Sequence, residues 1–132
     1  MLQPGITLTK MQVVTDDLTA KAVGSGGLEV FATPAMIALM EATAMACVAP
    51  YLQDGMGTVG TAVDAKHVAA TPVGMRVRCE CALTAVQGRR LTFALQAFDD
   101  AGLIGKATHE RVIVDNERFL QKAVSRGEVS KS

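Results

Sequence analysis

The amino-acid sequence predicts an α+β fold in which a long, curled antiparallel β-sheet wraps around one central apolar helix. One observation behind this prediction is a Thr-Pro pair that opens a long segment without a charged face. The other is a series of long segments in which apolar and polar residues alternate, joined by short turns. With 132 residues, 49% of them hydrophobic, the chain is expected to form a single domain around one core.

The N-terminal part, residues 1–29, is predicted to form an arm and the first strand, with the strand inside residues 10–23. It has no basic segment followed by an apolar one, so no signal peptide is expected and a cytoplasmic location is favoured. The chain has three cysteines: Cys47, Cys79 and Cys81. Their odd number and spacing fit neither a Cys-x-x-Cys redox motif nor a set of zinc ligands, so buried reduced thiols are expected.

The central helix is predicted over residues 33–52. Thr33 is a favoured N-cap residue, and Pro34 is favoured at the first helical position. The segment is apolar nearly all round, so the rest of the protein is expected to enclose it. Its apolar run is too short for a membrane span and carries Glu41 at its middle, which argues against a transmembrane helix.

Charged residues are balanced over the chain but nearly absent around this helix. The 13 Lys and Arg residues offset 13 Asp and Glu residues, so neither a nucleic acid nor an anionic membrane is expected as a partner. Between Ala32 and Val63, only Glu41 and Asp54 are charged. The core is therefore expected to lie in this charge-poor stretch.

Four antiparallel strands are predicted within residues 57–115. The alternating segments are residues 58–68, 75–87, 91–97 and 103–114. In the first of them, Val59 and His67 are predicted to share one face. In the last, the alternation changes phase near residues 108–111, which predicts a β-bulge there. Strands this long must curl, and a curled sheet around one helix is the hot-dog architecture.

The C-terminal part is predicted as a short helix or arm followed by a loose end. The helix is expected over residues 116–124. Residues 125–132 are small and polar, so they are expected to fray.

Two short motifs resemble known sites only in their letters. Residues 55–60 match G-x-G-x-x-G, but they precede a strand, whereas a dinucleotide site needs this motif after a strand and before a helix. The pair His109-Glu110 begins like a zinc-protease motif, but the second His is missing and the segment is a strand. No metal site is predicted.

Glu41 is the most informative residue, because it is a carboxylate on a helix that has no polar face. If it is buried and unpaired, desolvation would favour its neutral form and suit it to proton transfer. The alternatives are that it reaches a solvent gap or pairs with a buried cation. Thr33 and His67 could complete a site for nucleophile or base chemistry, but a capping role and a core role explain them equally well.

Several stretches of the sequence resemble the hot-dog thioesterases of the fluoroacetyl-CoA thioesterase type. They are residues 30–41, 57–61, 67–74 and 105–111, within a resemblance that covers residues 30–119. The catalytic Thr, Glu and His of that family fall on Thr33, Glu41 and His67, with the family's spacing. Gly60 matches the family's glycine near the thioester, and Arg111 matches the arginine of its Thr-His-Glu-Arg stretch.

The resemblance implies hydrolysis of a short acyl-CoA thioester to a carboxylic acid and free coenzyme A, with no further cofactor. It also implies a homodimer with active sites where the protomers meet. Glu41 would activate water or attack the carbonyl, His67 would exchange protons, and Thr33 would act as nucleophile or orient the reacting group. The family's aromatic lid is replaced by residues 25–28, Ser-Gly-Gly-Leu, so fluoroacetyl selectivity does not follow.

Two other functions are compatible with the same residues. A non-catalytic module could bind an acyl-CoA or a hydrophobic carboxylate in the same cleft, with Glu41 merely paired. A dehydratase or isomerase of this fold would also need a His and a carboxylate. Product analysis separates the second possibility from hydrolysis, and turnover separates the first.

Overall fold

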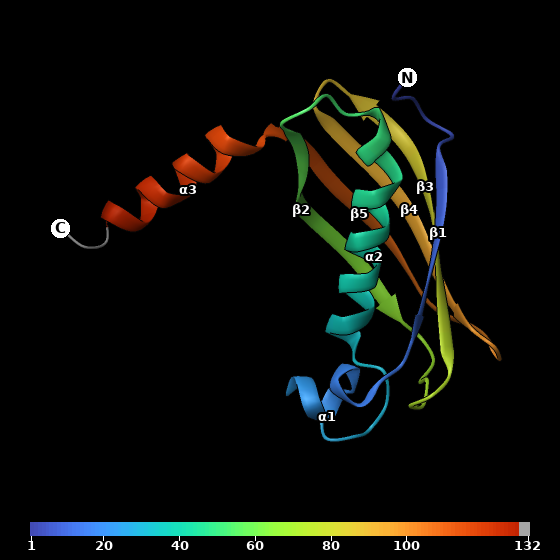
Figure 1. Cartoon of the computed structure of the whole chain (residues 1–132). Coiled ribbons are helices and arrows are strands. Elements are labelled where there is room, and N and C mark those ends of the chain that lie inside the picture. The colour runs from blue at the N-terminus through green and yellow to red at the C-terminus, as the bar shows by residue number, and fades with distance from the viewer. Residues whose placement is uncertain (130–132) are drawn as a thin grey trace.

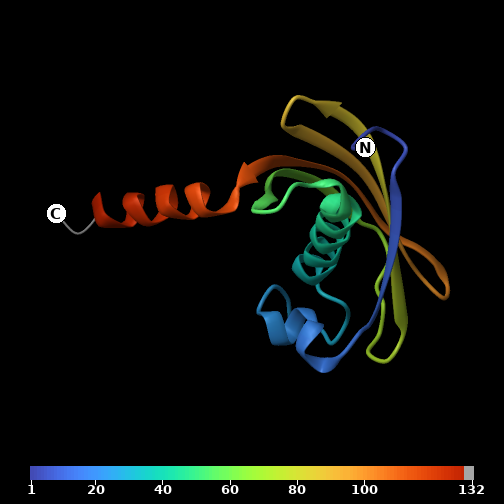
Figure 2. The ribbon, with the colours of Figure 1, turned by 45° about the horizontal axis from the view of Figure 1, so that its top comes forward.

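The computed structural model describes residues 1–129 and confirms the predicted α+β architecture, a five-stranded antiparallel sheet that curls around a central helix (Figure 1). The elements are, in order, β1 (Thr7–Val13), η1 (Asp16–Leu18), α1 (Ala20–Val23), α2 (Thr33–Val48), η2 (Ala49–Tyr51), β2 (Met56–His67), β3 (Arg76–Gln87), β4 (Arg90–Asp99), β5 (Gly102–Asp115) and α3 (Asn116–Val129). Figure 2 shows α2 inside the curve of the sheet, with α1 near the start of α2.

The sheet has the strand order β1-β3-β4-β5-β2, so the first two strands in the sequence form its two edges. Strands β3, β4 and β5 follow one another through tight hairpins, as the short turns predict. The first strand lies at Thr7–Val13, earlier than predicted, and pairs with β3. Strand β2 pairs with β5 on one side only, and its other side is open.

Helix α2 packs against the concave face of the sheet along one side only. Its buried residues are Met36, Leu39, Met40, Thr43, Ala44, Cys47 and Val48. The other side, which includes Ala38 and Met45, is exposed, and Met45 keeps 50% of its surface accessible. The prediction that the protein encloses this helix all round is therefore wrong for the single chain.

The length and apolar composition of residues Thr33–Tyr51 would be sufficient for a membrane span. In this structure, however, the helix is a core element, because one of its sides supplies much of the buried apolar cluster beneath the sheet. The three cysteines also lie buried as free thiols.

Thr33 is the first residue of α2 rather than its N-cap, which is Ala32. The cap has no side-chain hydrogen bond, so the predicted capping role of Thr33 is wrong. The hydroxyl of Thr33 is consequently available for a different partner.

The β-bulge predicted near residues 108–111 of the last strand is not found there. Strand β5 has its extra residue earlier, at Ile104, and another bulge lies in the neighbouring strand β2. In β2, Thr61 is the extra residue of a bulge, since Gly60 pairs with Arg111 and Ala62 pairs with Glu110. In β5, residues 107, 109 and 111 all face inward, so the alternation continues there without a change of phase. The predicted phase change came from the assumption that polar His109 and Arg111 face solvent, whereas both are buried.

The bulge also corrects the predicted faces of β2. Thr58 and Gly60 face α2 before the bulge, and Ala65 and His67 face it afterwards. Because an unbroken strand alternates its faces, Gly60 and His67 could share one side only with an extra residue between them. Val59, which we expected on the side of His67, therefore lies on the opposite side.

Helix α3 leaves the body of the molecule at the end of β5 (Figure 1). Its base is fixed by two hydrogen bonds, from Asn116 N to Gly55 O at 2.9 Å and from Arg118 N to the Asp115 carboxylate at 3.0 Å. The helix continues to Val129, through residues 125–129 of the segment expected to fray. Residues 130–132 lie outside the part of the chain described.

Candidate active site

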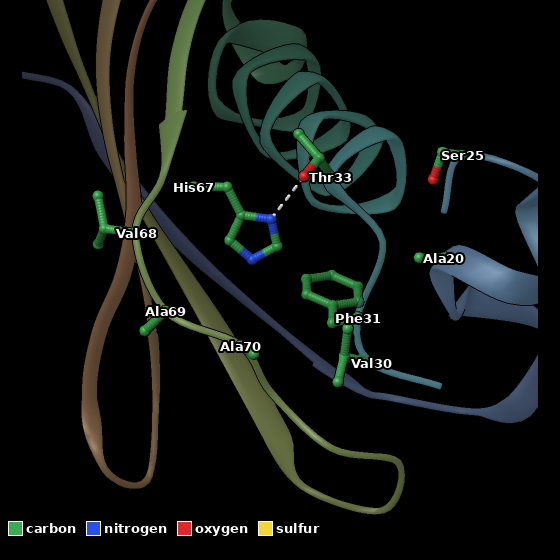
Figure 3. Close-up of a pocket in the computed structure, with 9 residues that line it drawn as sticks. All are labelled: Ala20, Ser25, Val30, Phe31, Thr33, His67, Val68, Ala69 and Ala70. Carbon is green, nitrogen blue, oxygen red and sulfur yellow. Dashed lines mark hydrogen bonds between the residues drawn. The ribbon is translucent and has the colours of Figure 1, made fainter. Parts of the chain in front are cut away.

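Thr33 and His67 form one half of the predicted site. Thr33 stands on the first turn of α2, and His67 is the last residue of β2. The Thr33 Oγ1 and His67 Nδ1 atoms are 2.8 Å apart, a hydrogen bond that joins helix and sheet (Figure 3). The structure thus brings together two residues that are 34 positions apart in the sequence.

A cavity of about 340 Å³ surrounds this pair. Apart from the pair itself, its lining residues are Ala20, Ser25, Val30, Phe31, Val68, Ala69 and Ala70. The ring of Phe31 meets the His67 ring edge-on, with the centroids 6.3 Å apart. The predicted departure from the family's lid, at residues 25–28, therefore forms part of the wall of this cavity through Ser25.

The imidazole of His67 has one nitrogen bonded and the other unused. Its Nε2 is buried and has no hydrogen-bond partner within residues 1–129. Burial lowers the pKa of His67, and the nearby backbone at Ala69 only partly opposes this effect. The ring is therefore neutral near pH 7, with Nε2 available to a group that enters the cavity.

Glu41, Gly60 and Arg111 form the other half of the predicted site. Glu41 lies two helical turns beyond Thr33, with its Oε2 atom 3.6 Å from an Arg111 nitrogen. The Glu41 side chain is 42% exposed, so the predicted burial is wrong, and Glu41 instead combines the two alternatives, pairing and access to solvent. The cause is the open side of α2, to which Glu41 belongs.

Arg111 is held rigidly beneath this carboxylate. Its Nε donates to Thr58 Oγ1 at 2.8 Å, and its second terminal nitrogen donates to the Thr58 carbonyl at 2.9 Å. The first terminal nitrogen contacts Nε2 of His109 at 3.2 Å. Burial lowers the pKa of the Arg111 guanidinium, and the Glu41 charge opposes this effect.

Gly60 fits in this cluster because it has no side chain. A Cβ atom there would lie 2.8 Å from Oε2 of Glu41, 3.2 Å from the His109 ring and 3.4 Å from an Arg111 nitrogen. Any larger residue would push the carboxylate away from the sheet. Gly60 is thus a residue of close approach, which agrees with its predicted place in the site.

Within one chain, the two halves of the site do not meet. Thr33 and Glu41 are eight residues apart on a straight helix, which corresponds to ~12 Å along its axis. The structure therefore shows contacts within each half, Thr33 with His67 and Glu41 with Arg111, but does not bring His67 to Glu41.

Two residues of the site were missed by the sequence analysis. Thr58 and His109 both bond Arg111, but neither was predicted to have a role. A signal was present in the sequence, since His109 and Arg111 continue the inward spacing of Ala107 on β5. Within residues 1–129, no group of three or more metal-ligating side chains is present.

Comparisons with known proteins place these features in context. A family model described as "Fluoroacetyl-CoA-specific thioesterase" matches residues 14–117. The fluoroacetyl-CoA thioesterase of Streptantibioticus cattleyicolor is 45% identical over 94 residues, which make up 71% of this chain and 68% of the relative.

Solved structures of two thioesterases have the same fold. A fluoroacetyl-CoA thioesterase superposes with a TM-score of 0.89 at 36% identity, covering 95% of this chain and 97% of the other. A thioesterase superfamily member from Thermus thermophilus superposes with a TM-score of 0.87 at 28% identity, covering 98% of each chain.

Proposed function

The chain belongs to the family of fluoroacetyl-CoA-specific thioesterases and is a thioesterase, and from this premise we propose that its substrate is a short acyl-CoA. We propose Thr33, Glu41 and His67 as the catalytic residues. The observation that carries the proposal is the Thr33–His67 hydrogen bond beside a cavity, with His67 Nε2 left unused. A neutral imidazole in that position can accept a proton from the hydroxyl or from water.

The proposed reaction consumes one water molecule and breaks the bond between the acyl carbon and sulfur. Glu41 either removes a proton from water or attacks the carbonyl itself to form an anhydride, which water then opens. The products are a carboxylic acid and coenzyme A, which takes a proton at sulfur. Backbone N–H groups at the start of α2 or near Gly60 would stabilise the developing oxyanion. No cofactor beyond the substrate's own coenzyme A is proposed.

We propose that a second copy of the chain completes each site. Thr33, Ile37, Glu41 and Met45 are spaced four residues apart, so they form one stripe on the open side of α2. Ile37 is midway between Thr33 and Glu41. If two copies of α2 pack antiparallel about a twofold axis near Ile37, Thr33 of one copy faces Glu41 of the partner subunit.

The open edge of the sheet supports the same arrangement. Strand β2 is unpaired on its outer side and carries His67 at its end, and Val63 on this strand is 37% exposed. Pairing of this edge with a second β2 would cover backbone groups that now face solvent. It would also close the gap of ~12 Å between the two halves of the site, because the missing half comes from the partner.

Coexpression of two inactive variants tests this arrangement. Chains carrying Glu41→Gln and His67→Ala, with different tags, are purified as a mixed dimer. If the halves come from different subunits, one of the two sites contains no substitution, and the mixed dimer recovers about half of the parent kcat. If both halves come from one chain, every site carries a substitution and activity stays at the level of the variants, which would refute the proposal.

A panel of acyl-CoA esters, assayed for free thiol, tests the reaction itself. Short saturated acyl groups, fluoroacetyl and longer chains should be compared, because Ser25 and two glycines replace an aromatic lid at the cavity. Release of thiol from the short esters, dependent on Glu41, is expected. Saturable binding of the same esters without turnover would favour the binding module instead, which the Glu41–Arg111 pair would also allow.

We also propose a cytoplasmic location. Three free thiols are buried in the core, and burial raises the pKa of all three, most strongly that of Cys81. An odd set of unbridged cysteines is typical of a reducing compartment.

A further inference from the structure

One buried titratable side chain, His109, has no part in the proposed reaction. It lies on β5 with 1% of its surface exposed, and its ring packs against Phe93 with the centroids 6.2 Å apart. Although His109 is buried in the core, it does not only fill space there. Both of its ring nitrogens contact polar groups, and one of these groups is the side chain of Arg111.

The partners of His109 determine where its proton lies. Nδ1 is 2.8 Å from the carbonyl oxygen of Ala62, which can only accept, so Nδ1 carries a hydrogen. Nε2 is 3.2 Å from a terminal nitrogen of Arg111, which can only donate, so Nε2 presents its lone pair. His109 is thus a neutral imidazole in a single tautomer.

The bulge in β2 makes this arrangement possible. Ala62 follows directly after the bulge residue Thr61, where the regular pairing of β2 with β5 is interrupted. The hydroxyl of Thr61 contacts Glu110 O at 3.2 Å, and the Ala62 carbonyl is bonded by the His109 ring. The irregularity in one strand therefore anchors a side chain of the next.

Arg111 has five N–H groups, and most of them are hydrogen-bonded to residues other than Glu41. Thr58 accepts from Nε and from one terminal nitrogen, and His109 accepts from the other terminal nitrogen. That last nitrogen is also the one nearest to Glu41, at 3.6 Å. Arg111 is therefore not free to turn a full edge toward the carboxylate and bind it with two short hydrogen bonds.

We propose that His109 is a positioning residue, which holds Arg111 in an orientation that limits its contact with Glu41 to a single long one. The proposal rests on the role of Glu41 in the proposed function. A carboxylate gripped by two short bonds would be fixed in place and less able to reach a water molecule or a carbonyl carbon. The single long contact keeps a positive charge beside Glu41 while its carboxylate stays mobile.

Three substitutions of His109 test which of its contacts matters. The amide of His109→Gln can stand where Nε2 stood and accept from Arg111. The shorter amide of His109→Asn can donate to Ala62 O but does not reach Arg111. His109→Phe keeps the ring and its packing against Phe93 but removes both hydrogen bonds.

We expect His109→Asn and His109→Phe to lower kcat by about 10- to 100-fold with little change in KM, because Arg111 moves and the Glu41 geometry is disturbed. His109→Gln should stay within about threefold of the parent. If the Asn and Phe variants keep the parent kcat, or the Gln variant falls as far as the Asn variant, the positioning role is refuted. Thermal unfolding of each variant identifies any loss due to misfolding.

A spectroscopic measurement tests the proposal without any assay. The chain has only two histidines, so long-range ¹H–¹⁵N spectra of the parent and of His67→Ala assign the His109 signals. The pattern of a neutral ring with hydrogen on Nδ1 is expected near pH 7. A ring with hydrogen on Nε2, or a charged ring, would contradict the proposed contact with Arg111 even if the variants are unstable.

Failure of this inference can be told apart from failure of the proposed function. Glu41→Gln tests the function alone, since it leaves the contacts of His109 intact. If Glu41→Gln is inactive while His109→Asn and His109→Phe are fully active, only the role of His109 is lost. If Glu41→Gln keeps full activity, the catalytic set itself is wrong.

Discussion

The two halves of the site stand on the same stripe of α2, but they are built in different ways. Thr33 and His67 share one hydrogen bond at the edge of a cavity, and His67 Nε2 is without a partner among the described residues. Glu41, by contrast, projects from a network in which Arg111 is bound by Thr58 and His109. The first half has unused hydrogen-bonding capacity, and the second half has little.

This difference follows from the charges involved. A neutral pair can be left open, because its unsatisfied nitrogen costs little once water or substrate fills the cavity. A buried guanidinium cannot be left open, because an unpaired ionic group in the interior costs several kcal/mol. The half with the neutral Thr33–His67 pair can therefore be adaptable, whereas the half that holds a fixed charge must be preorganised.

Replacement of the Glu41 carboxylate should lower kcat more than any other substitution in the two halves of the site. Glu41→Gln keeps the size of the side chain but removes its charge and its basicity. We expect kcat to fall by about 10²- to 10⁴-fold, as for loss of a general base, with the fold intact because the site is part-exposed. Glu29→Gln, an exposed residue away from the network, is the control and should retain parent activity.

A methyl group in the rigid half should have the next largest effect. Gly60→Ala places a Cβ 2.8 Å from Glu41 Oε2, so we expect kcat to fall by about 10- to 100-fold through misplacement of the carboxylate.

The matched control lies on the same strand. In Gly57→Ala, the three atoms nearest to the added Cβ all belong to the side chain of Asn116, which can rotate away. Equal losses of kcat in both variants would mean that β2 as a whole, rather than the network around Glu41, is sensitive to substitution.

The loop that follows His67 should matter more for stability than for catalysis. Thr71 is buried and donates to the Asp99 carboxylate at 2.8 Å, which ties the cavity wall to the β4–β5 turn. Thr71→Val should lower the free energy of unfolding by about 1–3 kcal/mol, because Asp99 loses a partner. Urea denaturation measures this change.

Thr84→Val is the control for that measurement, because the exposed Thr84 hydroxyl makes a similar bond to Thr92 O at 3.1 Å. Its effect should stay within about 0.5 kcal/mol. A loss as large as that of Thr71→Val would show that burial of the hydrogen bond is not what matters.

The smallest expected effect is in the titration of His67. Burial lowers its pKa below the ordinary 6.5, so the neutral ring, and the activity that depends on it, should persist below pH 6.5. Since the unfolded chain binds the proton more readily, stability should be complete above pH 6.5 and fall as the pH drops through the lowered pKa.

NMR titration of the His67 ring provides the check, with His67→Gln as the control for the dependence of stability on pH. A midpoint at or above 6.5 would contradict the desolvated environment assigned to the first half of the site.

The sequence predicted the elements of the fold more accurately than the surroundings of its polar residues. Thr33-Pro34 marks the start of α2, and the alternation over β3 and β4 marks those strands, because local propensity and burial agree there. The rule that polar residues face solvent failed at His109 and Arg111. They are buried together because each forms a hydrogen bond with the other. The periodicity of the sequence does not reveal such a hydrogen bond between side chains.

The candidate site residues were predicted from their spacing and from the family resemblance, whereas their contacts are seen only in the structure. Glu41 looked buried in the sequence because the helix around it is apolar, whereas in the structure it lies on the open side of α2. The sequence alone does not indicate which apolar residues the chain itself covers and which it leaves exposed. The separation of ~12 Å between the two halves likewise becomes visible only in the folded structure.

The free edge of β2 has a consequence for how the chain resists aggregation. An uncovered strand is a template for open-ended aggregation, and this one lies beside an apolar stripe. The bulge at Thr61 twists that edge, and Asp64 and Lys66 place opposite charges along it. These features penalise flat stacking of many chains, so solubility in the newly made protein depends on the same strand that carries His67.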